Sequence, residues 1–98
     1  MANMYITEYG SIGAMRSNIA QEPAIAVQKV AFTGTPGQSA AFNAATILVR
    51  IHVDGIASIK FGTNPTAATT DPRLPADTTE YFAVPPSGSY KVSAITNT

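Results

Sequence analysis

Cysteine is absent from this chain of 98 residues, and only 12% of its residues carry a charged side chain. Without cysteine the chain can form neither a disulfide framework nor a thiolate zinc site, so redox chemistry gives no indication of its compartment. Six Lys and Arg residues balance six Asp and Glu residues, and the cations are spaced singly along the sequence. Because nucleic-acid-binding proteins carry clustered cations, we expect no nucleic-acid partner.

Long apolar runs are also missing. The first nine residues lack a basic stretch followed by an apolar core, and no window approaches the ~20 apolar residues of a membrane-spanning helix. We therefore expect neither an export signal nor a membrane partner.

Low charge is combined with a hydrophobic fraction of 45%. A protein that stays monomeric in solution usually keeps a more highly charged surface, so this composition favours assembly with other subunits. A chain of this length forms one domain and buries about 60 to 65% of the surface of its unfolded state, a modest amount that partner surfaces would supplement. We predict a single β-sandwich domain over residues 1–98, with an N-terminal arm at about 1–23 and a long loop at 62–79.

The most regular part of the sequence is residues 46–62, where two alternating runs are joined at Asp54 and Gly55. Successive side chains of a strand point to opposite sides, so each run has one apolar face. The apolar positions are Ile47, Val49, Ile51, Val53, Ala57, Ile59 and Phe61, whereas Arg50, His52 and Asp54 share the opposite face of the first run. Two strands with one apolar face each need a second layer to cover them, which predicts an all-β fold, a small antiparallel β-sandwich that is jelly-roll-like.

We expect these two runs to pair with each other as a β-hairpin. A two-residue turn would place Val49 opposite Lys60 and mix the two faces, because a shift of one residue inverts every side chain. A three-residue connection at 54–56 instead places Val53 opposite Ala57, and so keeps the apolar positions of both runs together.

Further strands are expected at residues 4–9, 24–32, 80–84 and 90–95. The first of them is expected to pair with the edge of a sheet, as terminal strands often do. Residues 62–79 are polar and contain three prolines, so we expect an ordered excursion without long ladder pairing. A loop of this length in a small domain usually has a function or is held by a partner.

No set of residues points to catalysis or to a metal site. His52 is the only histidine, and Asp54 is the only carboxylate on the same strand face, so the ligand set of a metal site is incomplete. A serine nucleophile would need a motif such as Gly-x-Ser-x-Gly, which this chain lacks. Asp71, Asp77 and Glu80 are close in sequence, but the two aspartates suit turn capping better than a glycosidase pair. We expect no enzyme activity, no catalytic or metal-binding residue and no cofactor.

Four segments are distinctive when they are taken together: residues 40–46 (Ala-Ala-Phe-Asn-Ala-Ala-Thr), 49–55 (Val-Arg-Ile-His-Val-Asp-Gly), 59–67 (Ile-Lys-Phe-Gly-Thr-Asn-Pro-Thr-Ala) and 77–82 (Asp-Thr-Thr-Glu-Tyr-Phe). In these segments the chain resembles a family of small proteins encoded among the structural genes of tailed bacteriophages. The resemblance covers about residues 32–95, and the run from Phe61 to Pro65 is its most distinctive part. It implies a virion structural protein that decorates or cements the capsid, without a catalytic motif. It also implies that the major capsid protein is the partner, and that the chain reaches the capsid surface after assembly in the host cytoplasm.

We expect contacts with the shell to come from the N-terminal strand and the long loop. The candidate interface residues are Tyr5, Tyr9, Asn64, Pro65 and Arg73. A homo-oligomer is expected, with a trimer as the expected form, because threefold positions of a capsid invite cyclic closure.

An alternative interpretation is a carbohydrate-binding or tail- or fibre-associated structural module that uses exposed tyrosines and polar loops. A small cupin-like enzyme is the weakest alternative, because one histidine cannot supply the usual metal ligands.

Overall fold

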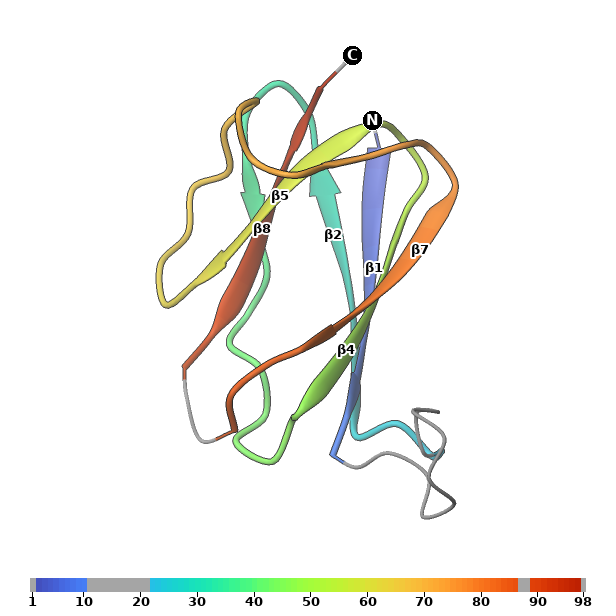
Figure 1. Ribbon diagram of the computed structural model, residues 1–98, viewed down its shortest axis with the longest axis vertical. Coiled ribbons are helices and arrows are strands. Elements are labelled where there is room, and N and C mark those ends of the chain that lie inside the picture. Colours follow the sequence, from blue (N-terminus) through green and yellow to red (C-terminus); the bar gives the residue numbers. More distant parts are fainter. Residues whose placement is uncertain (1, 11–21, 87–88, 98) are drawn as a thin grey trace.

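The computed structural model describes residues 2–10, 22–86 and 89–97, and in these ranges it contains strands and no helix (Figure 1). The strands are β1 (Ala2–Tyr9), β2 (Ala26–Phe32), β3 (Gly37–Gln38), β4 (Leu48–Val53), β5 (Ala57–Gly62), β6 (Arg73–Leu74), β7 (Thr78–Ala83) and β8 (Lys91–Thr96). The described residues therefore include no helix that could cross a membrane.

The strands form two four-stranded sheets, in the orders β2-β1-β4-β7 and β3-β8-β5-β6. Every ladder in both sheets is antiparallel. The two sheets lie face to face and enclose the hydrophobic core (Figure 1). The predicted all-β fold, a small antiparallel β-sandwich, is confirmed.

The strand pairs are nested along the chain. β5 pairs with β6, β4 with β7 and β3 with β8, and successive pairs alternate between the two sheets. A long antiparallel hairpin rolled up in this way is a jelly roll. The fourth pair is β2 with β1, so the N-terminal strand occupies the place that a strand after β8 would take. Ala2 and Thr96 accordingly line one surface hollow, and both ends of the chain lie at the same end of the sandwich (Figure 1).

The predicted hairpin between β4 and β5 is wrong, because these strands belong to different sheets. Residues 54–56 carry the chain from one layer to the other. Asp54 N donates to Asn3 O at 3.1 Å beside β1, and Asn97 N donates to Ile56 O at 3.1 Å beside β8. The alternating pattern requires only that each apolar face be covered, and here the faces of β4 and β5 cover each other across the core.

The N-terminal strand lies inside a sheet and not at an edge. β1 pairs with β2 on one side and with β4 on the other, with Tyr5 opposite both Lys29 and His52. Residues 2–9 of the expected arm are thus part of the sandwich, whereas 11–21 lie outside the described residues. Of the other predicted strands, 24–32, 80–84 and 90–95 correspond to β2, β7 and β8 with shifts of one or two residues at their ends.

The core contains the inward side chains of both sheets. Its buried members are Met4, Ile6, Phe32, Phe42, Val49, Ile51, Val53, Ala57, Ile59, Leu74, Val84, Val92 and Ala94.

Glu8 lies on the same side of β1 as Met4 and Ile6, so a carboxylate is buried at one end of this layer. It accepts hydrogen bonds from Gln28 Nε2 at 3.0 Å, Asn43 N at 2.7 Å and Thr46 Oγ1 at 2.8 Å.

The excursion after β5 lies against the outer side of the sheet β3-β8-β5-β6. Ala67 N donates to Ser93 Oγ at 3.0 Å, and Asn97 Nδ2 bridges Ser58 Oγ at 2.8 Å and Thr69 O at 3.1 Å. Ser58 and Ser93 point away from the core, yet both are fully buried. Residues 63–72 therefore cover the part of this outer face around Ser58 and Ser93, and lead into the two-residue strand β6, which pairs with β5.

Candidate interaction surface

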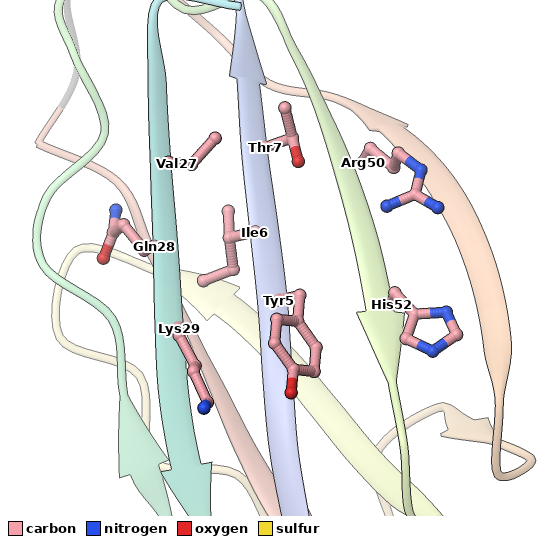
Figure 2. A pocket seen from close by; sticks show the side chains of 8 residues that line it. All are labelled: Tyr5, Ile6, Thr7, Val27, Gln28, Lys29, Arg50 and His52. Carbon is pink, nitrogen blue, oxygen red and sulfur yellow. The ribbon is translucent and has the colours of Figure 1, made fainter.

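The outer side of the other sheet, β2-β1-β4-β7, stays exposed. Side chains of all four strands project from it, and six of them line a shallow hollow that Figure 2 shows from close by. We call this surface the open face and define it by Tyr5, Thr7, Val27, Lys29, Arg50, His52, Thr79 and Tyr81. It forms because β1 lies between β2 and β4, so that the polar side of each strand adds to one continuous surface.

Strand register arranges the open face in two rows. One row runs across the sheet as Lys29, Tyr5, His52 and Thr79, and the next as Val27, Thr7, Arg50 and Tyr81. Directly opposed side chains in neighbouring strands have Cβ atoms about 5 Å apart, so each row forms a line of touching groups. The open face therefore combines aromatic, cationic and aliphatic groups from segments far apart in sequence.

Tyr5 is the centre of the first row. Lys29 Nζ lies 5.6 Å from the centroid of its ring, and the His52 ring lies 6.1 Å away at an interplanar angle of 49°. His52 Nδ1 is in turn 2.9 Å from Thr79 Oγ1. Because Lys29 and His52 belong to the strands on either side of β1, the Tyr5 ring is flanked from both directions (Figure 2). A cation over an aromatic ring stabilises such an exposed arrangement by about 0.5–1 kcal/mol.

Exposed hydrophobic side chains gather on this side of the molecule. Among the described residues, the large hydrophobic side chains that remain exposed are Val27 at 72%, Tyr81 at 53%, Ile25 at 42% and Tyr5 at 37%. All four lie on the outer side of the sheet β2-β1-β4-β7; Ile25 extends the pairing of β2 with β1 by donating its N–H to Glu8 O at 2.9 Å. Tyrosine, arginine and aliphatic side chains of this kind are typical of protein–protein interfaces.

The open face carries positive charge and no negative charge. Lys29, Arg50 and His52 are among the eight residues that define it, and none of the eight is Asp or Glu, although Asp54 follows His52 on the same side of the sheet. The nearest acidic side chains lie at its two ends, where Asp54 Oδ1 accepts from Asn3 N at 2.6 Å and Glu22 Oε2 accepts from Tyr9 Oη at 2.8 Å. The chain as a whole has no net charge, so the open face is a local concentration of cations.

Tyr9 follows Tyr5 and Thr7 on the same side of β1 but is only 4% exposed. Burial raises the pKa of the Tyr9 phenol above its usual value of 10.0, and the hydrogen bond to the Glu22 carboxylate raises this pKa further. Tyr9 therefore binds Glu22 at the end of the open face and offers almost no surface to a partner.

The five candidate interface residues do not lie together. Tyr5 is on the open face, and Tyr9 is buried at the end of the same strand. Asn64, Pro65 and Arg73 lie at the opposite sheet. Asn64 Oδ1 accepts from Gln38 Nε2 at 3.1 Å, Pro65 is buried, and the exposed Arg73 of β6 donates from Nε to Asn97 O at 3.3 Å.

Sequence reasoning missed most of the open face. It placed Arg50 and His52 on a common polar face, but not next to Tyr5, Val27 and Lys29. The missing information was the register of β1 between β2 and β4, which alternation within a single strand does not contain.

The described residues hold no group of three or more His, Cys, Asp or Glu side chains that could bind a metal ion. The closest polar partner of His52 is the Thr79 hydroxyl. Asp71 has the predicted capping role, since its Oδ2 accepts from Ala68 N at 2.8 Å while its own N–H donates to Ala68 O at 2.9 Å.

Comparisons with protein-family models, with curated proteins and with solved structures found no match to this chain.

Proposed function

We propose that this chain is a structural protein of a tailed-bacteriophage particle that decorates or cements the capsid through contacts with the major capsid protein. The observation that carries the proposal is that the four large hydrophobic side chains left exposed among the described residues gather on the outer side of one sheet. The sequence resemblance over residues 32–95 supports the assignment to a virion. In this proposal the chain folds in the host cytoplasm and ends on the capsid surface.

The shape of the open face suits a protein partner. A stable contact buries about 1,200 Å² in total, or about 600 Å² on each partner. That is roughly one ninth of the 5383 Å² surface of this chain. The open face spans all four strands of one sheet and is held by a packed core, and preorganised surfaces bind with a smaller entropic cost.

The test of this proposal is the composition of purified particles of the phage that encodes the chain. Mass spectrometry should find the chain in many copies in proportion to the major capsid protein. Particles assembled without the gene should release their DNA at a lower temperature, and added purified protein should restore the wild-type temperature. Absence of the chain from purified particles would contradict the proposal.

The trimer remains part of the proposal. The mass of one chain is 10.2 kDa, so a trimer has three times that value, about 31 kDa. Sedimentation equilibrium of the purified protein separates the two masses directly.

A carbohydrate-binding module is the second candidate, because Tyr5 and Tyr81 are exposed beside Lys29, Arg50 and His52. Aromatic rings bind sugars through a free ring face, however, and the Tyr5 ring is flanked by Lys29 and His52. Of these two tyrosines, Tyr81 is the more exposed, at 53%. Binding of the isolated protein to a glycan array, together with no binding to particles, would favour this candidate.

A further inference from the structure

We infer that the open face is the surface that docks on the shell, and that its partner is an acidic protein patch presenting Asp or Glu carboxylates to Lys29 and Arg50. The inference rests on the proposed function, since it names the surface and the chemistry by which the shell is bound. Of the two segments expected from the sequence, it keeps residues 4–9 through Tyr5 and Thr7 of β1, and it replaces 62–79 with the other strands of one sheet.

The first argument is the asymmetry between the two outer faces. The outer side of β3-β8-β5-β6 is partly covered by the chain itself, through the hydrogen bonds of Ala67 with Ser93 and of Thr69 with Asn97. The outer side of β2-β1-β4-β7 keeps Val27 and Tyr81 more than half exposed. A sandwich that covers one sheet with its own loop leaves the other sheet available to a partner.

The second argument is charge complementarity. Lys29 and Arg50 lie in adjacent rows on opposite sides of β1, and no carboxylate of the described strands lies between them (Figure 2). Carboxylates of a partner would fill this gap, and Arg50 can bind one of them through two parallel hydrogen bonds. Steering by such charges also raises the rate of association.

A second copy of the chain fits this face poorly. A twofold dimer through the open face would bring Lys29 and Arg50 of one copy towards the same cations of the other. Like charges in an interface are strongly unfavourable. A twofold dimer through the open face is therefore unfavourable, because it would join this face to itself.

The decisive experiment compares two double variants that change the charge by the same amount. K29E/R50E reverses both cations of the open face, whereas K60E/R73E reverses two exposed cations of the other sheet. Each purified protein is added to particles that lack the chain, and bound protein is measured by co-sedimentation. We expect K29E/R50E to bind on the order of 100-fold more weakly, and K60E/R73E to stay within about twofold of wild type.

Circular dichroism and a thermal melt verify that both variants fold. If K29E/R50E does not fold, the neutral variant K29Q/R50Q replaces it, with K60Q/R73Q as its control. Wild-type binding should also weaken as NaCl is raised from about 50 to about 500 mM, because salt screens the charge pairs.

The outcomes separate the inference from the proposed function. If wild type binds and K29E/R50E binds equally well, the inference is overturned while the proposed function stands. If wild type does not bind particles at all, the proposed function itself fails. Binding of polygalacturonate, but not of neutral dextran, by a protein that ignores the particles would assign the open face to an acidic glycan and overturn the inference.

Discussion

At the scale of single residues, Glu8 shows how a polar group can organise an apolar layer. Its carboxylate is 1% exposed and accepts three hydrogen bonds, from β2, from Asn43 N and from Thr46 Oγ1. A buried carboxylate is tolerated only when its oxygens are satisfied in this way. Glu8 thereby joins the centre of one sheet to the segment that leads into β4.

Replacing Glu8 by alanine removes the acceptor of the partly buried Asn43 N–H and leaves the Thr46 hydroxyl buried without this partner. We expect Glu8→Ala to lower the free energy of unfolding by about 3 kcal/mol, since hydrogen bonds to charged groups are strong and unpaired donors are costly. Urea denaturation measures this change. Thr46→Val removes a single donor and should cost about 1 kcal/mol. A loss below that of Thr46→Val would contradict this account of Glu8.

Because of Tyr9, we expect the stability of the fold to decrease at alkaline pH. Its folded-state pKa is raised above 10.0 by burial first and by Glu22 second. The unfolded chain therefore releases the phenolic proton at a lower pH than the folded chain, so the stabilising contribution is complete below pH 10.0 and is lost as the pH rises above it. Phe at this position cannot ionise.

We expect wild type to lose stability more steeply than Tyr9→Phe between about pH 9.5 and pH 11, although Tyr9→Phe is about 1 kcal/mol less stable at pH 8 because its bond to Glu22 is gone. Urea denaturation at a series of pH values gives both slopes. Parallel slopes for the two proteins would show that Tyr9 does not titrate as this environment requires.

At the scale of elements, the sequence predicts the strands better than it predicts their neighbours. Alternation along residues 46–62 located β4 and β5 and their buried faces correctly, because side-chain direction follows from the backbone of one strand. The same pattern is satisfied by a hairpin or by two strands facing each other across a core, and the second arrangement is the one observed.

Short elements escaped detection for a related reason. β3 and β6 have two residues each, too few to show a period, and they are defined by their ladders with β8 and β5. The open face was only half predictable. Arg50 and His52 belong to one alternating run, whereas Lys29 and Tyr5 reach them only through long-range register.

Gly37 allows β3 to lie very close to the end of β2. A Cβ added there would lie 2.3 Å from Ala31 O, a backbone atom that cannot move aside without distorting β2. Gly34, three residues earlier, has nothing within 4 Å of such a Cβ.

We expect Gly37→Ala to lower the free energy of unfolding by about 2 kcal/mol or more, because a steric conflict with the backbone must be relieved by moving a strand. Gly34→Ala should change it by less than about 0.5 kcal/mol. Thermal denaturation of both variants compares them under identical conditions. Equal stability of the two variants would contradict the observed packing of β3.

At the scale of the whole molecule, the sandwich has two different outer sides. One is covered by residues 63–72, and the other is the open face with its tyrosines and cations. The low charge of the chain, 12% of residues, favoured assembly from composition alone. The structure also indicates which surface would take part in assembly, since the large hydrophobic side chains that stay exposed among the described residues lie on a single side.

The same asymmetry changes how the long loop must be interpreted. The loop was expected to contact the shell, but its backbone binds the buried Ser93 of the neighbouring sheet through Ala67 N. Deleting residues 66–73 would therefore reduce the stability of the fold as well as any contact with a partner. Surface substitutions on the open face test docking more cleanly, because they leave these buried hydrogen bonds in place.

The most direct test of the whole account is a symmetry-resolved reconstruction of the particle of the phage that encodes this chain. We predict density for the sandwich on the outside of the shell, with β2-β1-β4-β7 facing the major capsid protein and residues 63–72 facing solvent. Carboxylates of the shell should lie within hydrogen-bonding distance of Lys29 and Arg50. A shell without this density, or a sandwich bound with its open face towards solvent, would contradict the account.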